Sequence, residues 1–305
     1  MNRGLLPQYV IKCISASVCA VASMNITCAS LEIELAHGSL ERGVVRAGIG
    51  GWNFAEWRNN FYPEAWPQRR ELEYASRRLS AVEINSTFYG AQKPSSFAKW
   101  RDETPDDFVF SVKASRFATT RRILAEAGET IERFIGGGLS ELGAKLGPIV
   151  WQFAPTKRFE AADFEAFLGL LPKQVDGLRL RHVLDVRHPS FMCAEYLGLA
   201  RRYGAATVFA DSDEHPSFAN LTGDLVYARL MRSDAAQPLG YTPEALDRWA
   251  ERAKLWAAGG EPADLPRVAE VTATLAAPRD VFVLFISGAK ERAPHAAMGL
   301  KARLT

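Results

Sequence analysis

Residues 81–89 read AVEINSTFY, a short apolar run that ends in polar and aromatic side chains. If this run forms a strand, Glu83 and Asn85 share one face and the apolar residues beside them share the other, because side chains alternate along a strand. A carboxylate and an amide inside a protein cost free energy unless they bond to neighbours or to a ligand. The stretch therefore predicts a buried strand with a site at its C-terminal end.

Other short runs along the chain are rich in Val, Ile and Phe, as buried parallel strands are. Together they predict strands at 44–49, 81–85, 108–113, 148–153, 182–187, 206–211, 225–229 and 281–286. Apolar residues spaced three and four apart predict helices between the strands. The predicted helices lie at 95–100, 130–146 (with a break at the glycines 136–138), 162–171, 193–203, after Thr242-Pro243, and at 293–304.

Eight strands that alternate with helices predict a single-domain α/β fold, the (β/α)8 or TIM barrel. A doubly wound open sheet alternates in the same way. The count of eight favours the barrel, and so does the lack of a nicotinamide or flavin motif, because Asn53 stands where the G-x-G-x-x-G turn needs glycine. We expect the long connection at 259–279 on the lower side of the barrel, with a short helix at 268–275.

The composition is that of an ordinary soluble globular protein, with 48% apolar residues, 24% charged residues and a net charge of +2. So small a net charge argues against nucleic-acid binding, which needs a concentrated basic face. The nearest candidate is the cluster of Arg116, Arg121 and Arg122, which we interpret as a solvated loop. The four cysteines have no zinc-binding spacing and imply no disulfide.

Residues 1–43 show no strand or helix pattern continuous with the rest of the chain. Arg3 and Lys12 precede an uncharged stretch, as in a secretory signal peptide, but that stretch is too polar to span a membrane. We interpret 1–43 as a tail outside the 44–305 domain, or as the product of a start codon upstream of a true start at Met24. A cytoplasmic protein is then expected, and a secreted one is the alternative.

Polar side chains end six consecutive predicted strands, on the face that alternation assigns to Glu83. The catalytic groups of (β/α)8 barrels lie at these strand ends. The set is Glu83, Asn85, Ser111, Lys113, Gln152, Asp185, Arg187, Asp211, Tyr227 and Arg229, with His188 just beyond. Its acidic and basic members balance. A purely structural ionic network is the alternative, but buried ion pairs stabilise proteins less than apolar packing does.

The types of these residues suggest acid/base chemistry on a small polar or anionic metabolite. The predicted catalytic residues are Glu83, Lys113, Asp185 and Asp211. The predicted binding residues are Trp52, Asn85, Tyr89, Gln152, Arg187, His188, Arg229 and Tyr241. Glu83 is the expected general base, and Lys113 its partner or an anion clamp. His188 either contacts the ligand or caps a strand end, and a metal is disfavoured because cations lie beside the carboxylates.

Aromatic residues are frequent at the same rim. They are Trp52, Phe88, Tyr89, Phe191 and Tyr241. Flat rings beside paired charges suit a sugar-like or other ring-bearing polar molecule. The alternative is that the rings only cover the barrel core.

Several stretches resemble the DUF72 family of YecE-like proteins. They are GIGGW at 48–52, FYP at 61–63, VEINSTFY at 82–89, FVFSVK at 108–113, RHPS at 187–190, ADS at 210–212 and GYT at 240–242. The resemblance covers residues 44–305 and implies a TIM barrel with a polar pocket at the strand C-termini, but no particular reaction. The chain differs from many relatives at Asp185, where they have Glu, and at 285–290, so a relative's substrate does not transfer to it.

The sequence thus favours an enzyme that uses Glu83 and Lys113 for acid/base catalysis on a small polar metabolite. A non-catalytic binding or sensing barrel is the second hypothesis. A metal-dependent nuclease-like or isomerase-like barrel is the third, and the balanced charge and the scarcity of histidines count against it.

Overall fold

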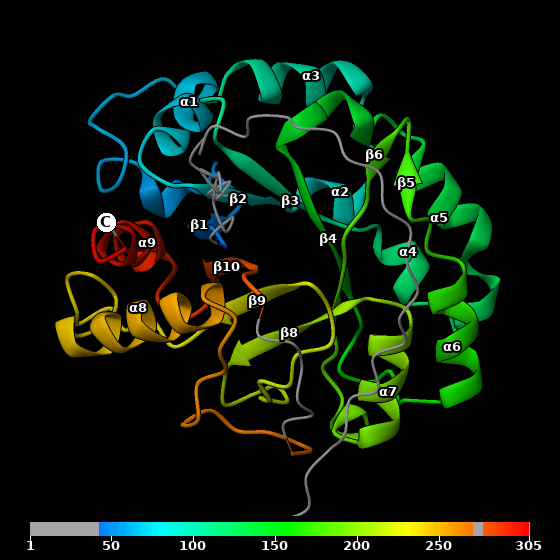
Figure 1. Ribbon diagram of the computed structural model, residues 1–305. Coiled ribbons are helices and arrows are strands. Elements are labelled where there is room, and N and C mark those ends of the chain that lie inside the picture. The colour runs from blue at the N-terminus through cyan, green and yellow to red at the C-terminus, as the bar shows by residue number, and fades with distance from the viewer. Residues whose placement is uncertain (1–42, 271–276, 305) are drawn as a thin grey trace, which may run out of the picture. The chain divides into compact units, whose positions relative to one another are not determined.

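The computed structural model describes residues 43–270 and 277–304, and its centre is a closed barrel of eight parallel strands (Figure 1). The strands are β1 (Val45–Gly50), β2 (Ala81–Ile84), β3 (Val109–Lys113), β4 (Leu146–Gln152), β7 (His182–Asp185), β8 (Ala206–Asp211), β9 (Leu225–Leu230) and β10 (Asp280–Phe285). Their order around the barrel is β1-β10-β9-β8-β7-β4-β3-β2. The predicted (β/α)8 barrel is confirmed, and every predicted strand is present.

Helices connect the strands on the outside of the barrel (Figure 1). They are α1 (Glu71–Ser76), α2 (Ser86–Tyr89), α3 (Pro94–Asp102), α4 (Arg116–Thr119), α5 (Gly128–Ile135), α6 (Ala161–Gly169), α7 (Ala194–Arg202), α8 (Pro243–Ala257) and α9 (Ala293–Lys301). A small antiparallel hairpin, β5 (Gln174–Val175) and β6 (Leu178–Arg179), precedes β7 and was not predicted. Within the described ranges no helix is long and apolar enough to cross a membrane. The predicted tail lies outside the described residues, apart from Gly43.

Helix α8 begins where the sequence predicts, because Thr242 caps it and a proline follows. Thr242 Oγ1 accepts a hydrogen bond from the backbone N–H of Ala245 at 3.2 Å, which satisfies an otherwise unpaired amide of the first turn. Trp249 and Trp256 of the helix pack against Phe209 of β8, with ring centroids 5.8 and 6.1 Å away. This apolar contact holds α8 on the outer side of the barrel.

The predicted break at 136–138 in the helix at 130–146 is confirmed, but the second half is a 3-10 helix and its last residue begins a strand. Helix α5 ends at Ile135, and a separate 3-10 segment, η4 (Leu139–Lys145), precedes Leu146, the first residue of β4. The three glycines favour this break, since glycine costs about 1 kcal/mol relative to alanine inside a helix. Gly138 has a φ of 105°, and a Cβ there would lie 2.8 Å from Pro94, so this turn requires glycine.

The connection at 259–279, which the sequence placed on the lower side of the barrel, joins α8 to β10. It packs against the segment between β8 and β9, where Asn220 accepts a hydrogen bond from the Val268 N–H at 2.8 Å and donates one to the Ala269 carbonyl at 2.9 Å. These bonds fix this part of the connection, and residues 268–270 are not helical. The remainder of the predicted helix at 268–275 lies outside the described residues.

Side chains from alternate strand positions fill the barrel interior. The apolar members are Ala81, Val109, Val150, Val183, Ala206, Val208, Ala210, Leu225, Tyr227, Phe282 and Leu284. Glu83 follows Ala81 by two residues, and Lys113 follows Val109 by four, so both point to the same interior. The strand alternation thereby places polar side chains above this apolar layer, at the C-terminal end of the barrel.

Candidate functional site

The C-terminal ends of the strands surround a cavity of about 390 Å³. Its wall combines charged, amide and aromatic side chains. Its charged, amide and aromatic members include Phe54, Glu83, Asn85, Tyr89, Lys113, Gln152, Arg187, Arg229 and Lys290. We call this cavity the mouth pocket. It brings together Glu83 and six other residues of the predicted site.

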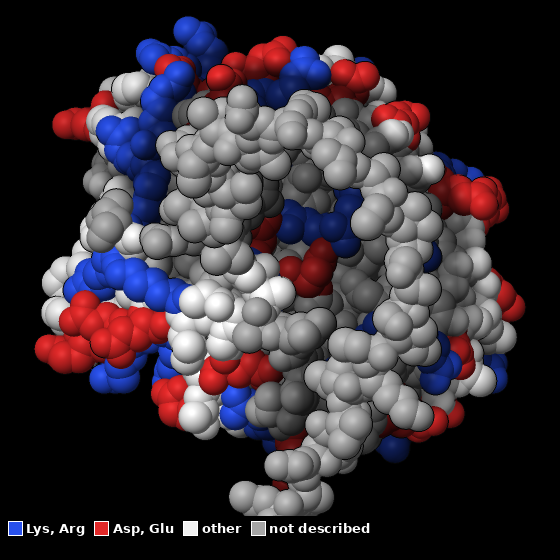
Figure 2. Space-filling view, in the orientation of Figure 1, with Lys and Arg blue, Asp and Glu red and all other residues white. Residues whose placement is uncertain are grey.

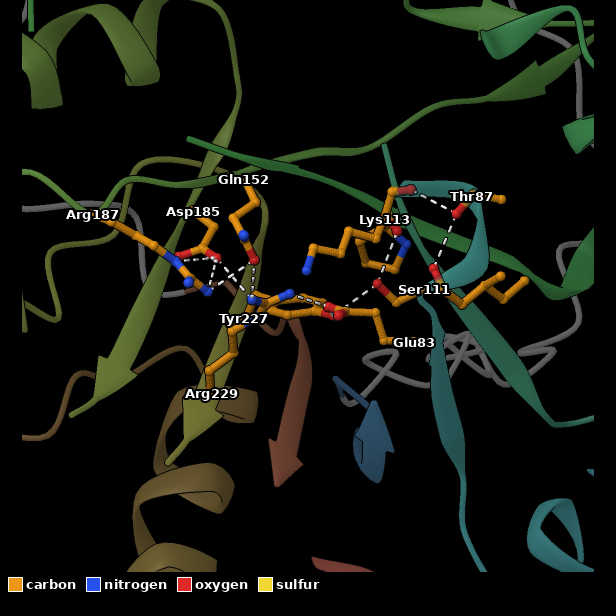
Figure 3. Close-up of polar contacts among 11 residues, drawn as sticks. Glu83, Thr87, Ser111, Lys113, Gln152, Asp185, Arg187, Tyr227 and Arg229 are labelled. Carbon is orange, nitrogen blue, oxygen red and sulfur yellow. Dashed lines mark hydrogen bonds and ion pairs between the residues drawn. The ribbon is translucent and has the colours of Figure 1, made fainter. Parts of the chain in front are cut away.

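Arg229 of β9 lies at the centre of the polar cluster, with its side chain 1% exposed. Its Nη2 donates a hydrogen bond to Glu83 Oε2 of β2, and its Nη1 donates to Asp185 Oδ2 of β7 at 2.8 Å (Figure 3). Nη1 also lies 3.3 Å from Gln152 Oε1 of β4. Burial opposes the charged form, but Glu83 and Asp185 outweigh it and raise the pKa of Arg229 above its ordinary value. One permanently charged guanidinium thus links four strands.

Arg187 holds the same carboxylate from the outer side of the cluster. Its Nε and Nη2 donate to Asp185 Oδ2 at 3.2 and 3.0 Å, and its Nη2 donates to Gln152 Oε1 at 2.8 Å. Burial alone would raise the pKa of Asp185, but Arg229 and Arg187 outweigh burial and hold that pKa below its usual range. Asp185 is therefore ionised at neutral pH and occupied by two arginines.

Tyr227 and Ser111 extend the cluster into the barrel interior (Figure 3). The Tyr227 hydroxyl donates to Glu83 Oε2 at 2.8 Å. The Ser111 hydroxyl lies 2.8 Å from the Tyr227 oxygen and 3.1 Å from the Pro148 carbonyl, and it has one proton for these two acceptors. Burial raises the pKa of Tyr227 well above its ordinary value, so its proton stays available to Glu83. Both residues stood in the predicted set but had no predicted role.

Lys113 extends from the end of β3 toward Gln152 and Arg229 (Figure 3). Its Nζ lies 4.3 Å from the centre of the Phe88 ring, which gives a cation–π contact. Among the residues that the structure describes, its ammonium group has no hydrogen bond or ion pair. Burial lowers the pKa of Lys113 to about 8, although the carboxylate of Glu83 opposes the shift. Lys113 is thus a site residue that changes protonation state close to neutral pH.

Loops add residues that sequence reasoning missed. Lys290 opens the 3-10 turn η6 (Lys290–Arg292) after β10, and its Nζ lies 3.8 Å from the centre of the Phe54 ring. The Trp57 indole N–H donates to the Lys290 carbonyl at 2.7 Å, which fixes the start of this turn. The sequence shows only that Lys290 is a cation shortly after a strand end. Side chains in a loop do not alternate between two faces, so the direction of Lys290 could not be predicted.

The charges of the mouth pocket do not balance, in contrast to the prediction. Basic and acidic side chains are interspersed over the visible surface (Figure 2). In the pocket, however, four cations meet the carboxylates of Glu83 and Asp185. The four are Lys113, Arg187, Arg229 and Lys290. The described wall thus has an excess of two positive charges when Lys113 is protonated.

Asp211 and Tyr241 lie elsewhere, and their predicted place in the same site is wrong. Both line a separate cavity of about 630 Å³ beside α8. Ala210 pairs with Arg229 across the β8–β9 ladder, so Asp211 faces outward. Asp211 lies 3.4 Å from Arg232, and burial raises its pKa in spite of that arginine. The Tyr241 hydroxyl accepts a hydrogen bond from the Arg232 backbone N–H at 3.0 Å.

Trp52 and His188 also lie outside the wall of the mouth pocket. Trp52 packs edge-on against Trp100, with ring centroids 5.2 Å apart, so it covers the core as the alternative reading proposed. His188 Nδ1 accepts a hydrogen bond from the Ser190 N–H at 3.1 Å, which makes it a cap of the 3-10 turn that follows β7. In the described part of the chain, no three His, Cys, Asp or Glu residues come together as metal ligands.

The fold and this pocket define a (β/α)8 barrel with a cationic pocket at the strand C-termini. The family model of DUF72, a protein of unknown function, matches residues 46–305. The chain belongs to the DUF72 family, as its motifs indicated.

Relatives with names that describe no activity support this assignment. The chain is 29% identical over 123 residues to the UPF0759 protein YecE of Escherichia coli strain K12, which is 39% of this chain and 42% of YecE. It is 31% identical over 71 residues to the UPF0759 protein YunF of Bacillus subtilis, which is 23% of this chain and 24% of YunF. The aligned region thus spans less than half the length of these curated relatives.

Two solved structures show the same fold. A DUF72 family protein from Thermotoga maritima (TM1631) matches with a TM-score of 0.62 at 22% identity, covering 85% of this chain and 98% of that one. A DUF72 family protein from Enterococcus faecalis (EF0366) matches with a TM-score of 0.60 at 17% identity, covering 86% and 95%. At these identities the likeness establishes the barrel architecture.

Proposed function

We propose that this protein is an enzyme that binds a small, polar, anionic metabolite in the mouth pocket and uses Lys113 as its acid/base group. The observation that carries the proposal is the excess of cationic side chains over carboxylates around the pocket. Charges that are partly removed from water need partners, and an anion would complete this set. A cavity of about 390 Å³ suits a small metabolite.

The donors that would hold the anion are those not already used by the protein. Lys290 and Lys113 contact aromatic rings rather than carboxylates. Arg229 has its Nε buried with no hydrogen-bond partner among the described residues, although its other nitrogens are engaged. An anionic oxygen near these groups would gain charge-assisted hydrogen bonds, which are stronger than neutral ones.

Lys113 is better suited to proton transfer than the predicted general base, Glu83. The Glu83 Oε2 accepts hydrogen bonds from Arg229 and Tyr227, and the residue is only 1% exposed. These two bonds occupy the lone pairs of Oε2 and hold the carboxylate in place. The pKa of Lys113 is lowered to about 8. General acid/base catalysis is most efficient when the pKa of the group is near the operating pH, so Lys113 can take up or release a proton there. In this proposal Glu83 holds Arg229 in place and supplies the negative charge that faces Lys113.

A non-catalytic binding barrel is the second candidate, and one observation favours it. Both carboxylates of the cluster are occupied by arginines, which leaves Lys113 without an evident partner for a second proton transfer. Such a pocket would bind an anion and release it unchanged.

The two candidates differ in what happens to the ligand. We would screen sugar phosphates, hydroxy acids and their neutral counterparts by thermal shift, and follow the stabilising compounds by NMR during long incubation. Conversion that is lost in Lys113→Met, while weaker binding persists, supports the enzyme. Recovery of the ligand unchanged from wild-type protein supports the binding barrel. Asp211→Asn, in the separate cavity, is the control. Equal stabilisation by anionic and neutral compounds would contradict both candidates.

A further inference from the structure

A second cavity, of about 440 Å³, lies outside the mouth pocket. It is bounded by the segments that follow β2 and β3, including α3 on one side and α4 and α5 on the other, and α4 and α5 lie side by side in Figure 1. Its volume is in the range of small-molecule sites. The chemistry proposed at the barrel mouth uses none of its lining residues.

The walls of this cavity are more apolar than polar, and three of the lining residues are aromatic. Phe97 of α3, Phe117 of α4 and Phe134 of α5 line it, each from a different helix. Phe97 is buried, whereas Phe117 is 55% exposed. Exposed rings beside a cavity favour an apolar ligand, because its binding would remove ring surface from water.

Arg121 provides one charged group at the same wall. Its Nη2 donates a hydrogen bond to Thr130 Oγ1 at 3.0 Å. Its Nε is buried without a hydrogen-bond partner, and among the described residues its guanidinium forms no ion pair. A buried donor that lacks an acceptor costs about 1–3 kcal/mol, so the fold gains if a ligand supplies one. This residue came from the basic cluster that the sequence suggested was only a solvated loop.

We propose that this cavity binds a small aromatic carboxylate, with its ring among Phe97, Phe117 and Phe134 and its carboxylate on Arg121. A guanidinium presents two parallel donors, which match the two oxygens of a carboxylate. Arg133 also lines the cavity, but it is paired with Glu129, so the guanidinium of Arg121 is the one that matches a single negative charge. The three phenylalanines match an apolar ring. The mouth pocket differs, because several cations converge there and it suits a more polar and more highly charged ligand.

Calorimetric titration of the full chain with phenylacetate and indole-3-acetate tests this proposal, with phenylacetamide and indole-3-acetamide as neutral counterparts. Wild-type protein is expected to bind the carboxylates and to bind the amides at least about tenfold more weakly, since a charge-assisted bond is lost. Arg121→Met should weaken carboxylate binding by a similar factor. The neighbouring Arg122→Met is the matched control and should leave the affinity unchanged.

A filling substitution provides a test that does not depend on Arg121. Ala91 is an exposed loop residue that lines the cavity, so Ala91→Trp should block binding without disturbing the core. Thermal unfolding of each variant would verify that it folds. The proposal is overturned if wild-type protein binds neither carboxylate at millimolar concentration, or if Arg121→Met and Ala91→Trp bind like wild type. It is also overturned if Arg187→Met, at the barrel mouth, removes the binding instead. None of these outcomes depends on whether the mouth pocket is catalytic.

Discussion

Arg229 and Glu83 form an ion pair in which each side chain is only 1% exposed. The pair joins β9 to β2 across the barrel interior, and neither strand is a neighbour of the other in the sheet. Such a pair has lost its hydration, so each charge depends on the other and on the groups bonded to them. The polar cluster therefore belongs to the structural core as well as to the pocket.

Removing Arg229 should destabilise the fold strongly. Arg229→Met leaves the carboxylates of Glu83 and Asp185 buried without their common partner, and we expect the free energy of unfolding to fall by about 3–5 kcal/mol. The control is Arg232→Met, three residues beyond Arg229 in the sequence, because Arg232 is 48% exposed in its ion pairs. Its loss should cost about 1 kcal/mol or less. Urea denaturation of both variants measures the difference, and equal losses would contradict an enclosed ionic core.

Lys113 should react as an unusually acidic lysine. Only the neutral amine is nucleophilic, so its rate of acetylation by a small anhydride should rise with a midpoint near pH 8, where burial places its pKa. Mass spectrometry of tryptic or chymotryptic peptides measures this rate across pH, with the exposed Lys99 as the reference in the same sample. A midpoint for Lys113 at the ordinary lysine value, about 10.4, would exclude the role that we propose for it.

The same shift has a consequence for stability. The folded pKa of Lys113, about 8, lies below its unfolded value, so between these pH values the unfolded chain binds more protons. The contribution of Lys113 to the free energy of unfolding therefore increases as the pH rises through this interval. We expect wild-type protein to gain stability relative to Lys113→Met between pH 7 and pH 10, as measured by denaturation at each pH. A constant difference between the two proteins would argue against a shifted pKa.

Side-chain alternation was enough to predict the barrel and much of the site. On β2, β3, β4 and β9 the polar residue nearest the strand end lies on the interior face. Each lies an even number of positions after an interior residue of its strand, as Gln152 does after Val150. The period of two is a property of the strand itself, so it can be read without knowing the neighbours. The same property places Glu83 beside Arg229 once the barrel closes.

Two parts of the site depend on information that alternation does not contain. Asp211 ends β8 as the other polar residues end their strands, but the pairing of Ala210 with Arg229 turns Asp211 outward. The direction of Asp211 depends on how β8 pairs with β9, and the sequence of β8 alone does not determine this pairing. Lys290 and Phe54 come from loops, whose backbone has no repeat from which a direction can be predicted.

The enclosed position of Glu83 also changes an expectation from the sequence. A pocket carboxylate free to act as a base could be replaced by Gln with loss of turnover and little change in thermal midpoint. Because Glu83 is bonded to Arg229 and Tyr227, Glu83→Gln should instead lower the thermal midpoint as well. A midpoint equal to that of wild type would show that the ion pair contributes little.

Lys290 should contribute to anion affinity, and Asp211 should not. With inorganic phosphate as the probe, Lys290→Met is expected to weaken binding about tenfold or more, since one charged donor of the mouth pocket is lost. Asp211→Asn removes a charge of opposite sign from the separate cavity and should leave the affinity unchanged. Calorimetry at low salt measures both. A strong effect of Asp211→Asn, with none from Lys290→Met, would place the anion site beside α8 instead.

The hydroxyls of Ser111 and Tyr227 should be energetically coupled by the hydrogen bond between them. The Tyr227 hydroxyl donates to Glu83, so its lone pairs are free to accept from Ser111, which lies 2.8 Å away. Tyr227→Phe removes a donor from a buried carboxylate and should cost about 1–3 kcal/mol. Ser111→Ala should cost less, because Tyr227 still donates to Glu83 and no buried charge loses a donor. In a double-mutant cycle measured by urea denaturation, the two losses should be non-additive by about 0.5 kcal/mol or more. Strict additivity would mean that Ser111 donates to the Pro148 carbonyl alone and that the chain of hydroxyls ends at Tyr227.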